Sequence, residues 1–214
     1  MLDGPRLAPL SNSRPNALVV LIHGYGSNGN DLISLAAMIQ PSLPDAAFVA
    51  PNAPSQISGL AAAYQWWPIE TFSMAERTAG AEAAAPMLDA FITEELKRSG
   101  LGSDRLLLVG FSQGTMMALH VGLRRPEGIA GIVGISGMLV APERLKPDMR
   151  SRPPVLLIHG TQDNVVPFGS MELASTALAA VDVPVETHIS PGVGHGVGPD
   201  GLIAATEFAR RVLT

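Results

Sequence analysis

Residues 105–125 read RLLLVGFSQGTMMALHVGLRR, and this stretch decides how the rest of the chain is interpreted. Residues 105–110 form an apolar run typical of a buried strand, and residues 113–125 form an apolar run typical of a helix. Between them stands Gly110-Phe111-Ser112-Gln113-Gly114. The flanking glycines indicate a tight turn in which helix and strand approach closely. Such a turn, the Gly-x-Ser-x-Gly elbow, exposes the serine hydroxyl at the end of a sheet.

Outward from this stretch, strand-like and helix-like segments alternate. We expect further strands at residues 17–23, 47–50, 129–135, 155–159 and 185–189. We expect helices at residues 74–98, 168–181 and 201–213, and one near 31–39 that begins with Asp31 close to its N-cap. Alternating units of this kind predict an α/β fold, with a mostly parallel, doubly wound sheet flanked by helices. We expect a single domain over residues 1–214, with residues 1–16 as an extended N-terminal segment.

Two segments are less regular. Residues 51–72 form a long connection rich in Pro, Gly and Ser that contains Trp66 and Trp67, and a loop of this length is usually functional. Within the predicted helix 74–98, Pro86 is expected to kink the helix or to split it. The connections between the other strands are short, so we expect no separate cap domain.

Composition excludes several classes of protein. The chain of 214 residues has a formal net charge of −5 and no evident basic patch, which argues against nucleic-acid binding. It has no cysteine, which excludes a thiol nucleophile. The N-terminus has no signal-peptide pattern and no stretch is apolar enough to span a membrane, so we expect a cytoplasmic protein without stable membrane insertion.

Polar residues that follow predicted strands are candidates for chemistry, because sites in such sheets gather at the carboxyl ends of strands. Ser112, Asp163 and His195 each occupy such a position, in the chain order Ser, Asp, His. A serine hydroxyl needs a base to remove its proton, a neutral imidazole can do so near pH 7, and a carboxylate orients the imidazole. The alternatives are an N-cap for Ser112, a turn residue for Asp163 and a loop histidine for His195.

The remaining titratable candidates are weaker. His23 and His159 end apolar strands and are expected to be buried and structural, His120 lies within a helix, and His188 lies within a strand. Asp200 is expected to be the N-cap of the last helix. The histidines show no metal-ligand spacing and no glycine-rich loop has the pattern of a phosphate site, so we expect neither a metal nor a cofactor.

Acyl transfer through such a serine also needs donors for the negative oxygen of the tetrahedral intermediate. The backbone N–H of Gln113, which follows the serine, is one candidate. The backbone N–H of Tyr25, between Gly24 and Gly26 after the first long strand, is the other.

Apolar residues near the same strand ends are candidates for substrate contacts. Two adjacent tryptophans in a loop are hard to bury together, so we expect at least one of Trp66 and Trp67 to line a cleft. Met138, Leu139, Val165 and Val166 could form an acyl pocket, although core packing explains them equally well. Met116 is expected to be core.

Four motifs together carry a family resemblance. They are Leu21-Ile22-His23-Gly24-Tyr25-Gly26, the elbow at Gly110–Gly114, His159-Gly160-Thr161-Gln162-Asp163 with Val166-Pro167, and Gly194-His195. In these motifs the chain resembles the phospholipase/carboxylesterase family of α/β-hydrolases, which includes bacterial carboxylesterases and acyl-protein thioesterases. The resemblance implies an α/β-hydrolase fold and a lidless esterase or thioesterase without a cofactor. It also implies that Ser112, Asp163 and His195 are catalytic and that Tyr25 and Gln113 bind the oxyanion. Family members often form dimers, so a homodimer is compatible with it.

The chain departs from the family pattern at two places. The family commonly has Trp-Phe-Asp where this chain has Trp66-Trp67-Pro68-Ile69, and the elbow is often followed by glycine where this chain has Thr115. We expect the β-branched side chain of Thr115 to crowd the start of the helix slightly.

The sequence therefore predicts a serine carboxylesterase that acts on small-molecule esters with short- to medium-chain acyl groups. The alternatives are an acyl-protein thioesterase or a lysophospholipase-type hydrolase and, from another class, a non-catalytic binding module on a hydrolase scaffold.

Overall fold

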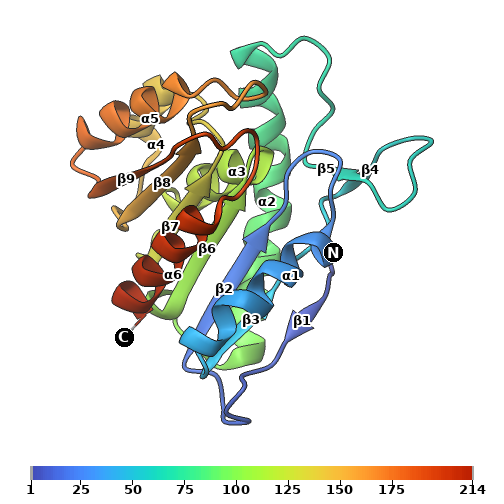
Figure 1. The fold of residues 1–214 in the computed structure, drawn as a ribbon, viewed down its shortest axis with the longest axis vertical. Coiled ribbons are helices and arrows are strands. Elements are labelled where there is room, and N and C mark those ends of the chain that lie inside the picture. Colours follow the sequence, from blue (N-terminus) through green and yellow to red (C-terminus); the bar gives the residue numbers. More distant parts are fainter. Residues whose placement is uncertain (1, 214) are drawn as a thin grey trace.

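The computed structural model describes residues 2–213, and its centre is a seven-stranded sheet in the order β1-β3-β2-β6-β7-β8-β9 (Figure 1). A separate two-stranded hairpin, β4–β5, lies beside it. The strands are β1 (Arg6–Leu7), β2 (Ala17–Ile22), β3 (Ala46–Val49), β4 (Ser55–Gln56), β5 (Tyr64–Gln65), β6 (Leu106–Phe111), β7 (Gly131–Ile135), β8 (Val155–Gly160) and β9 (Val185–Ser190).

The central strands are parallel and buried, as their unbroken apolar runs predict. Every residue of β2, β7 and β8 is buried. The edge strand β1 is the exception, because it pairs antiparallel with β3. The expected extended segment at residues 1–16 thus contributes a two-residue strand, which is too short to be recognised in the sequence.

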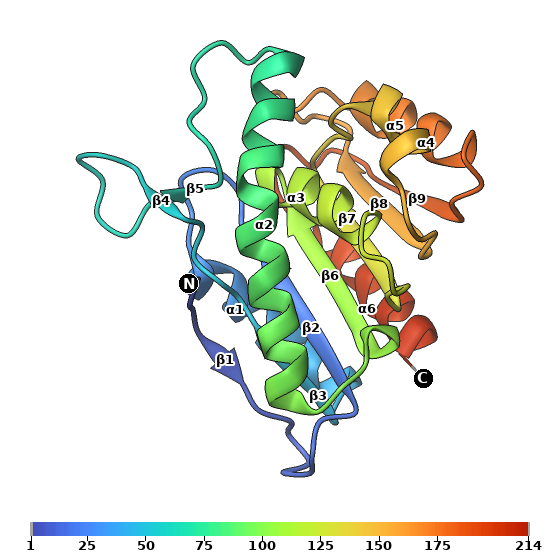
Figure 2. The same cartoon turned by 180° about the vertical axis from the view of Figure 1, so that it is seen from behind.

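Helices cover both faces of the sheet. They are α1 (Gly29–Ile39), α2 (Met74–Ser99), α3 (Gln113–Gly122), α4 (Leu145–Asp148), α5 (Gly169–Ala179) and α6 (Pro199–Leu213), with short 3₁₀ turns at Gln40–Ser42, Ser103–Arg105 and Pro142–Arg144. Figure 1 shows α1 and α6 on one face, and Figure 2 shows α2 and α3 on the other. The two faces bury separate apolar clusters, one under α1 and α6 and one under α2, α3 and α5.

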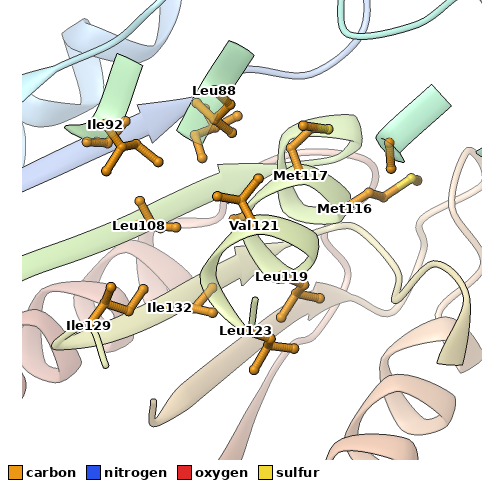
Figure 3. Packing of buried hydrophobic residues seen from close by; sticks show 14 of the residues in the cluster. Leu88, Ile92, Leu108, Met116, Met117, Leu119, Val121, Leu123, Ile129 and Ile132 are labelled. Atoms are coloured by element: carbon orange, nitrogen blue, oxygen red, sulfur yellow. The ribbon is translucent and has the colours of Figure 1, made fainter. Parts of the chain in front are cut away.

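The helix α3 lies deepest, since all ten of its residues are buried. Figure 3 shows its side chains between those of α2 and those of the sheet strands. Met117 and Leu119 are fully buried there. A helix held this firmly gives the residue at its N-terminus, Ser112, a fixed position.

The structure adds detail to three features expected from the sequence. The N-cap of α1 is Asn28, whose side chain accepts a hydrogen bond from the N–H of Asp31, so Asp31 lies in the first turn. The helix α2 continues through Pro86 without a break. Pro86 is exposed, so water can solvate the carbonyl that lacks the missing N–H. The long connection between β3 and α2 is not structureless, because it contains the hairpin β4–β5.

No connection within residues 2–213 forms a separate cap domain, which agrees with the expectation from the short loops. In the same range, no helix is both long and apolar enough to cross a membrane.

Candidate active site

Ser112, Asp163 and His195 follow β6, β8 and β9, and the structure brings their side chains into one hydrogen-bonded chain. His195 Nε2 lies 3.0 Å from Ser112 Oγ, and His195 Nδ1 lies 2.8 Å from Asp163 Oδ2. A carboxylate can only accept, so Nδ1 carries the proton and Nε2 accepts the hydrogen bond of the serine hydroxyl. This is the tautomer that a general base requires.

The backbone at Ser112 is a strained turn. Its φ of 54° and ψ of −116° lie outside the regions that side-chain-bearing residues usually adopt. Neighbouring glycines permit the turn, since a Cβ at Gly110 would lie 2.3 Å from the carbonyl oxygen of Gly114, and one at Gly114 would lie 1.9 Å from that of Ile22. The serine side chain does not cap α3. Ser112 thus stands at the N-cap position of α3, but its hydroxyl contacts His195 instead of capping the helix.

Thr115 fits this turn without the crowding that the sequence suggested. Its hydroxyl lies 2.8 Å from the carbonyl oxygen of Gly110 and accepts a hydrogen bond of 2.9 Å from the N–H of Ile135. The space for its branched side chain comes from glycines opposite, because a Cβ at Gly137 would lie 2.3 Å from Thr115 Cβ. Thr115 thus ties the two strands that flank the elbow.

Asp163 is buried and fully engaged. One oxygen, Oδ1, accepts hydrogen bonds of 2.9 Å from the N–H groups of Val165 and Val166, and the other contacts His195. Burial raises the pKa of Asp163, but the hydrogen bonds together lower it by more than burial raises it. The pKa of Asp163 therefore lies below its ordinary value. The carboxylate therefore remains charged, as a partner of an imidazolium must.

The other histidines have structural surroundings. His23 accepts a hydrogen bond from the N–H of Ala53 at its Nε2, and burial lowers its pKa. His159 is buried, and its Nε2 lies 2.9 Å from the carbonyl oxygen of Val166 and 3.3 Å from Asp163 Oδ2. The ring therefore packs beside the Asp163 carboxylate in the interior of the protein. His188 pairs with Asp200 at 2.9 Å. Asp200 lies in the first turn of α6 rather than at its N-cap, which corrects the expectation.

The two expected oxyanion donors lie beside the serine. Gln113 is the first residue of α3, where an N–H has no carbonyl four residues before it in the helix. Tyr25 lines the same cavity as Ser112 and His195, and a Cβ on its neighbour Gly24 would lie 3.1 Å from Ser112 Cβ. Gln113 has a second contact that the sequence did not reveal, since its side-chain amide bonds the backbone of Trp66 and Trp67 at 2.9 and 3.0 Å.

Ser112 and His195 open into a cavity of about 350 Å³. Its volume is within the range of small-molecule sites. The remaining lining residues are mostly apolar: Tyr25, Trp67, Ile69, Phe72, Glu76, Arg77, Gln113, Met116, Val165 and Val166.

The expected pocket residues divide into two groups. Trp67, Val165 and Val166 line the cavity, so one of the two tryptophans lies there as expected, whereas Trp66, Met138 and Leu139 do not line it. Leu139 is packed in the core and Trp66 donates its indole N–H to the carbonyl oxygen of His23. Met116, which we expected to be core, lines the cavity although it is buried.

Both tryptophans are buried, contrary to the argument that two neighbours could not be. Their exposed fractions are 3% for Trp66 and 5% for Trp67. Gly80 in α2 leaves room for Trp67, since a Cβ there would lie 2.1 Å from its indole. A glycine in the middle of a helix was the signal that could have predicted this close contact.

Four further cavity residues, Ile69, Phe72, Glu76 and Arg77, were not predicted from the sequence, whereas Val165 was among the candidates for the acyl pocket. The four come from the end of the long connection and the first turn of α2. Among residues 2–213, no group of three or more His, Asp or Glu side chains is placed to hold a metal ion.

Comparison with known proteins independently identifies the family of this chain. Residues 10–213 match the phospholipase/carboxylesterase family model. An acyl-protein thioesterase 1 of Schizosaccharomyces pombe is 30% identical over 92% of this chain and 91% of its own length. One of Gibberella zeae is 28% identical over 99% of this chain and 98% of its own length. The crystal structure of esterase PE8 superimposes with a TM-score of 0.95 at 47% identity, covering 99% of both chains. The chain therefore belongs to the phospholipase/carboxylesterase family and is a carboxylic ester hydrolase.

Proposed function

We propose that the protein is a serine carboxylesterase that hydrolyses short- to medium-chain acyl esters through an acyl-enzyme on Ser112. The observation that carries this proposal is the continuous chain of hydrogen bonds from Ser112 Oγ through His195 to Asp163. A serine hydroxyl with only a structural role would not need an imidazole backed by a buried carboxylate, and Ser112 also lines the cavity.

In the first half of the reaction, His195 Nε2 takes the proton of Ser112 as its oxygen attacks the ester carbonyl carbon. The N–H groups of Tyr25 and Gln113 stabilise the negative oxygen of the tetrahedral intermediate. His195 then donates the proton to the leaving alcohol, which leaves an acyl group on Ser112. In the second half, His195 activates water, which releases the acid and restores the serine.

The apolar lining and the volume of about 350 Å³ support a substrate with a compact apolar group rather than a long lipid chain. The test is kcat/KM on p-nitrophenyl esters from acetate to palmitate, measured beside Ser112→Ala. We expect a peak at two to six carbons that vanishes in the variant. A peak at the longest chains contradicts the chain-length proposal, and activity that survives Ser112→Ala contradicts the mechanism.

A second candidate keeps the chemistry and changes the substrate to a thioester. It is favoured by the relatives named acyl-protein thioesterases, which match nearly the whole chain. An S-acyl peptide and its matched oxygen ester distinguish the two, since an enzyme specialised for thioesters cleaves the S-acyl peptide much faster than its alkyl ester counterpart.

A further inference from the structure

Phe72 lies at the cavity in an unusual state. Its backbone φ is 56°, a left-handed conformation that a bulky residue rarely adopts. Its side chain is nevertheless 64% exposed and lines the cavity that contains Ser112 and His195. The strain therefore cannot be attributed to burial of the ring in the core. Strained backbone that persists is held by its surroundings and clusters at functional sites.

The first turn of α2 supplies the groups that hold this backbone. Glu76 Oε2 accepts hydrogen bonds from the N–H of Glu70 at 3.0 Å and from both the N–H and the hydroxyl of Thr71. On the other side of the aromatic residue, Arg77 donates a guanidinium hydrogen bond to the carbonyl oxygen of Phe72. We refer to Glu76 and Arg77 as the α2 clamp.

The hydrogen bonds of the α2 clamp differ from those of an ordinary helix N-terminus. Ser73 caps α2 by accepting the N–H of Glu76 at 3.2 Å, as in a capping box. In that motif the Glu side chain returns to the N–H of the cap residue, whereas here it reaches past Ser73 to the loop that precedes it. The hydrogen bonds from Thr71 and its neighbours lower the pKa of Glu76, so the carboxylate is charged at neutral pH.

A second apolar side chain is exposed at the same cavity. Val165, in the loop after β8, is 61% exposed and follows Asp163 by two residues. Phe72 and Val165 come from separate loops, yet both line one cavity whose other walls include Trp67 and Met116. When an apolar part of a ligand covers exposed apolar surface beside a reactive group, the burial of that surface stabilises the complex.

We propose that Phe72 is a specificity-determining contact for the apolar group attached to the ester, and that Glu76 and Arg77 are positioning residues that hold it at the cavity. The inference rests on the proposed function, since it concerns the same site. It names the substrate class more closely, because an ester with an apolar chain of several carbons on its acyl or alcohol side reaches Phe72, whereas a methyl group at Ser112 does not.

The experiment measures kcat and KM for two pairs of esters. The members of one pair differ in the length of the acyl group, and those of the other differ in the length of the alcohol group. The pairs are p-nitrophenyl hexanoate with p-nitrophenyl acetate, and hexyl acetate with methyl acetate. The variants are Phe72→Ala, Glu76→Ala and Glu76→Gln. The control is Met74→Ala, which removes an apolar side chain that is 43% exposed in the same region but does not line the cavity.

For Phe72→Ala we expect KM to rise about tenfold for the longer member of one pair, while the shorter member changes by less than about twofold. The pair that responds shows which side of the ester Phe72 contacts. Glu76→Ala should raise KM for the same substrate although the ring is still present. Glu76→Gln should keep KM close to the wild-type value, because its amide oxygen still accepts hydrogen bonds from the backbone of the loop. Met74→Ala should resemble the wild type.

An unchanged ratio of long to short substrates in Phe72→Ala overturns the inference, as does a general loss of kcat on all substrates in Glu76→Ala with a normal unfolding temperature. If Glu76→Ala does not fold, Phe72→Ala still decides the question, because the ring of Phe72 is mostly exposed and its removal leaves the core intact. Failure of the proposed function is separate, since the wild type would then show no turnover of acetate that depends on Ser112.

Discussion

Replacing Thr115 by valine removes one buried hydroxyl beside the candidate nucleophile and keeps the shape of the side chain. Thr115 is 1% exposed, and its hydroxyl accepts from the N–H of Ile135 and lies within 2.9 Å of the carbonyl oxygens of Gly110 and Ile135. A hydroxyl has one hydrogen, so it donates to one of these carbonyls at a time. Valine can neither donate nor accept there.

The size of the effect follows from the groups that lose a partner. The buried N–H of Ile135 loses its acceptor at a cost of about 1–3 kcal/mol, and the donated hydrogen bond contributes about 1 kcal/mol more. We therefore expect Thr115→Val to lower the free energy of unfolding by about 2–4 kcal/mol. For a chain of this size that corresponds to a decrease in Tm of roughly 5–15 °C.

The assay is thermal and urea unfolding of Thr115→Val beside Thr206→Val. Thr206 also lies in a helix, where its hydroxyl donates at 2.8 Å to the carbonyl oxygen of Leu202, which already accepts the helical hydrogen bond. The control should therefore change stability by less than about 0.5 kcal/mol. Equal losses in the two variants would show that the hydroxyl of Thr115 does not tie the strands beside the elbow, and the reasoning would be refuted.

Three further predictions concern the site and the fold. Asp163→Asn should lower kcat by about 10⁴-fold with little change in Tm, since an amide can favour the wrong tautomer of the base; steady-state kinetics check this, and a loss below tenfold would contradict it. Gly110→Ala should destabilise the protein by several kcal/mol because its Cβ would lie 2.3 Å from the carbonyl oxygen of Gly114, whereas Gly128→Ala, with no atom within 4 Å, should be nearly neutral in urea unfolding. Burial lowers the pKa of His120 from 6.5 to about 4, so the unfolded chain binds its proton more readily than the folded chain. The stability that His120 contributes is thus complete above pH 6.5 and is lost as the pH falls to about 4, and unfolding of His120→Leu should depend less on pH in this window than unfolding of the wild type.

The order of strands and helices could be read from the sequence because each buried parallel strand is a continuous apolar run. The positions of Ser112, Asp163 and His195 followed from the rule that polar residues after such strands share one edge of the sheet. The structure brings these three side chains together as expected. Local sequence was sufficient to predict this site because the end of each strand determines where the next residues lie at the edge of the sheet.

The cavity walls could not be read in the same way. Phe72, Glu76 and Arg77 are close in sequence, but their place beside Ser112 depends on how α2 packs against the sheet. Which of the two tryptophans lines the cavity could not be read either, because it depends on Gly80 of α2, whose missing Cβ leaves room for Trp67. The N-cap of α1 is Asn28, three residues before Asp31; both residue types suit a helix start, and only the backbone conformation decides which of them caps it.

The most direct test of the central claim is to identify the residue that forms the covalent intermediate. The enzyme would be incubated with diethyl p-nitrophenyl phosphate, which phosphorylates activated serines, and digested for peptide mass mapping, with Ser112→Ala treated in parallel. We expect one diethylphosphoryl group per chain on the peptide that contains Ser112, with loss of esterase activity in proportion to labelling and no label in the variant. Label on another residue, or full esterase activity in a chain labelled at Ser112, would contradict it.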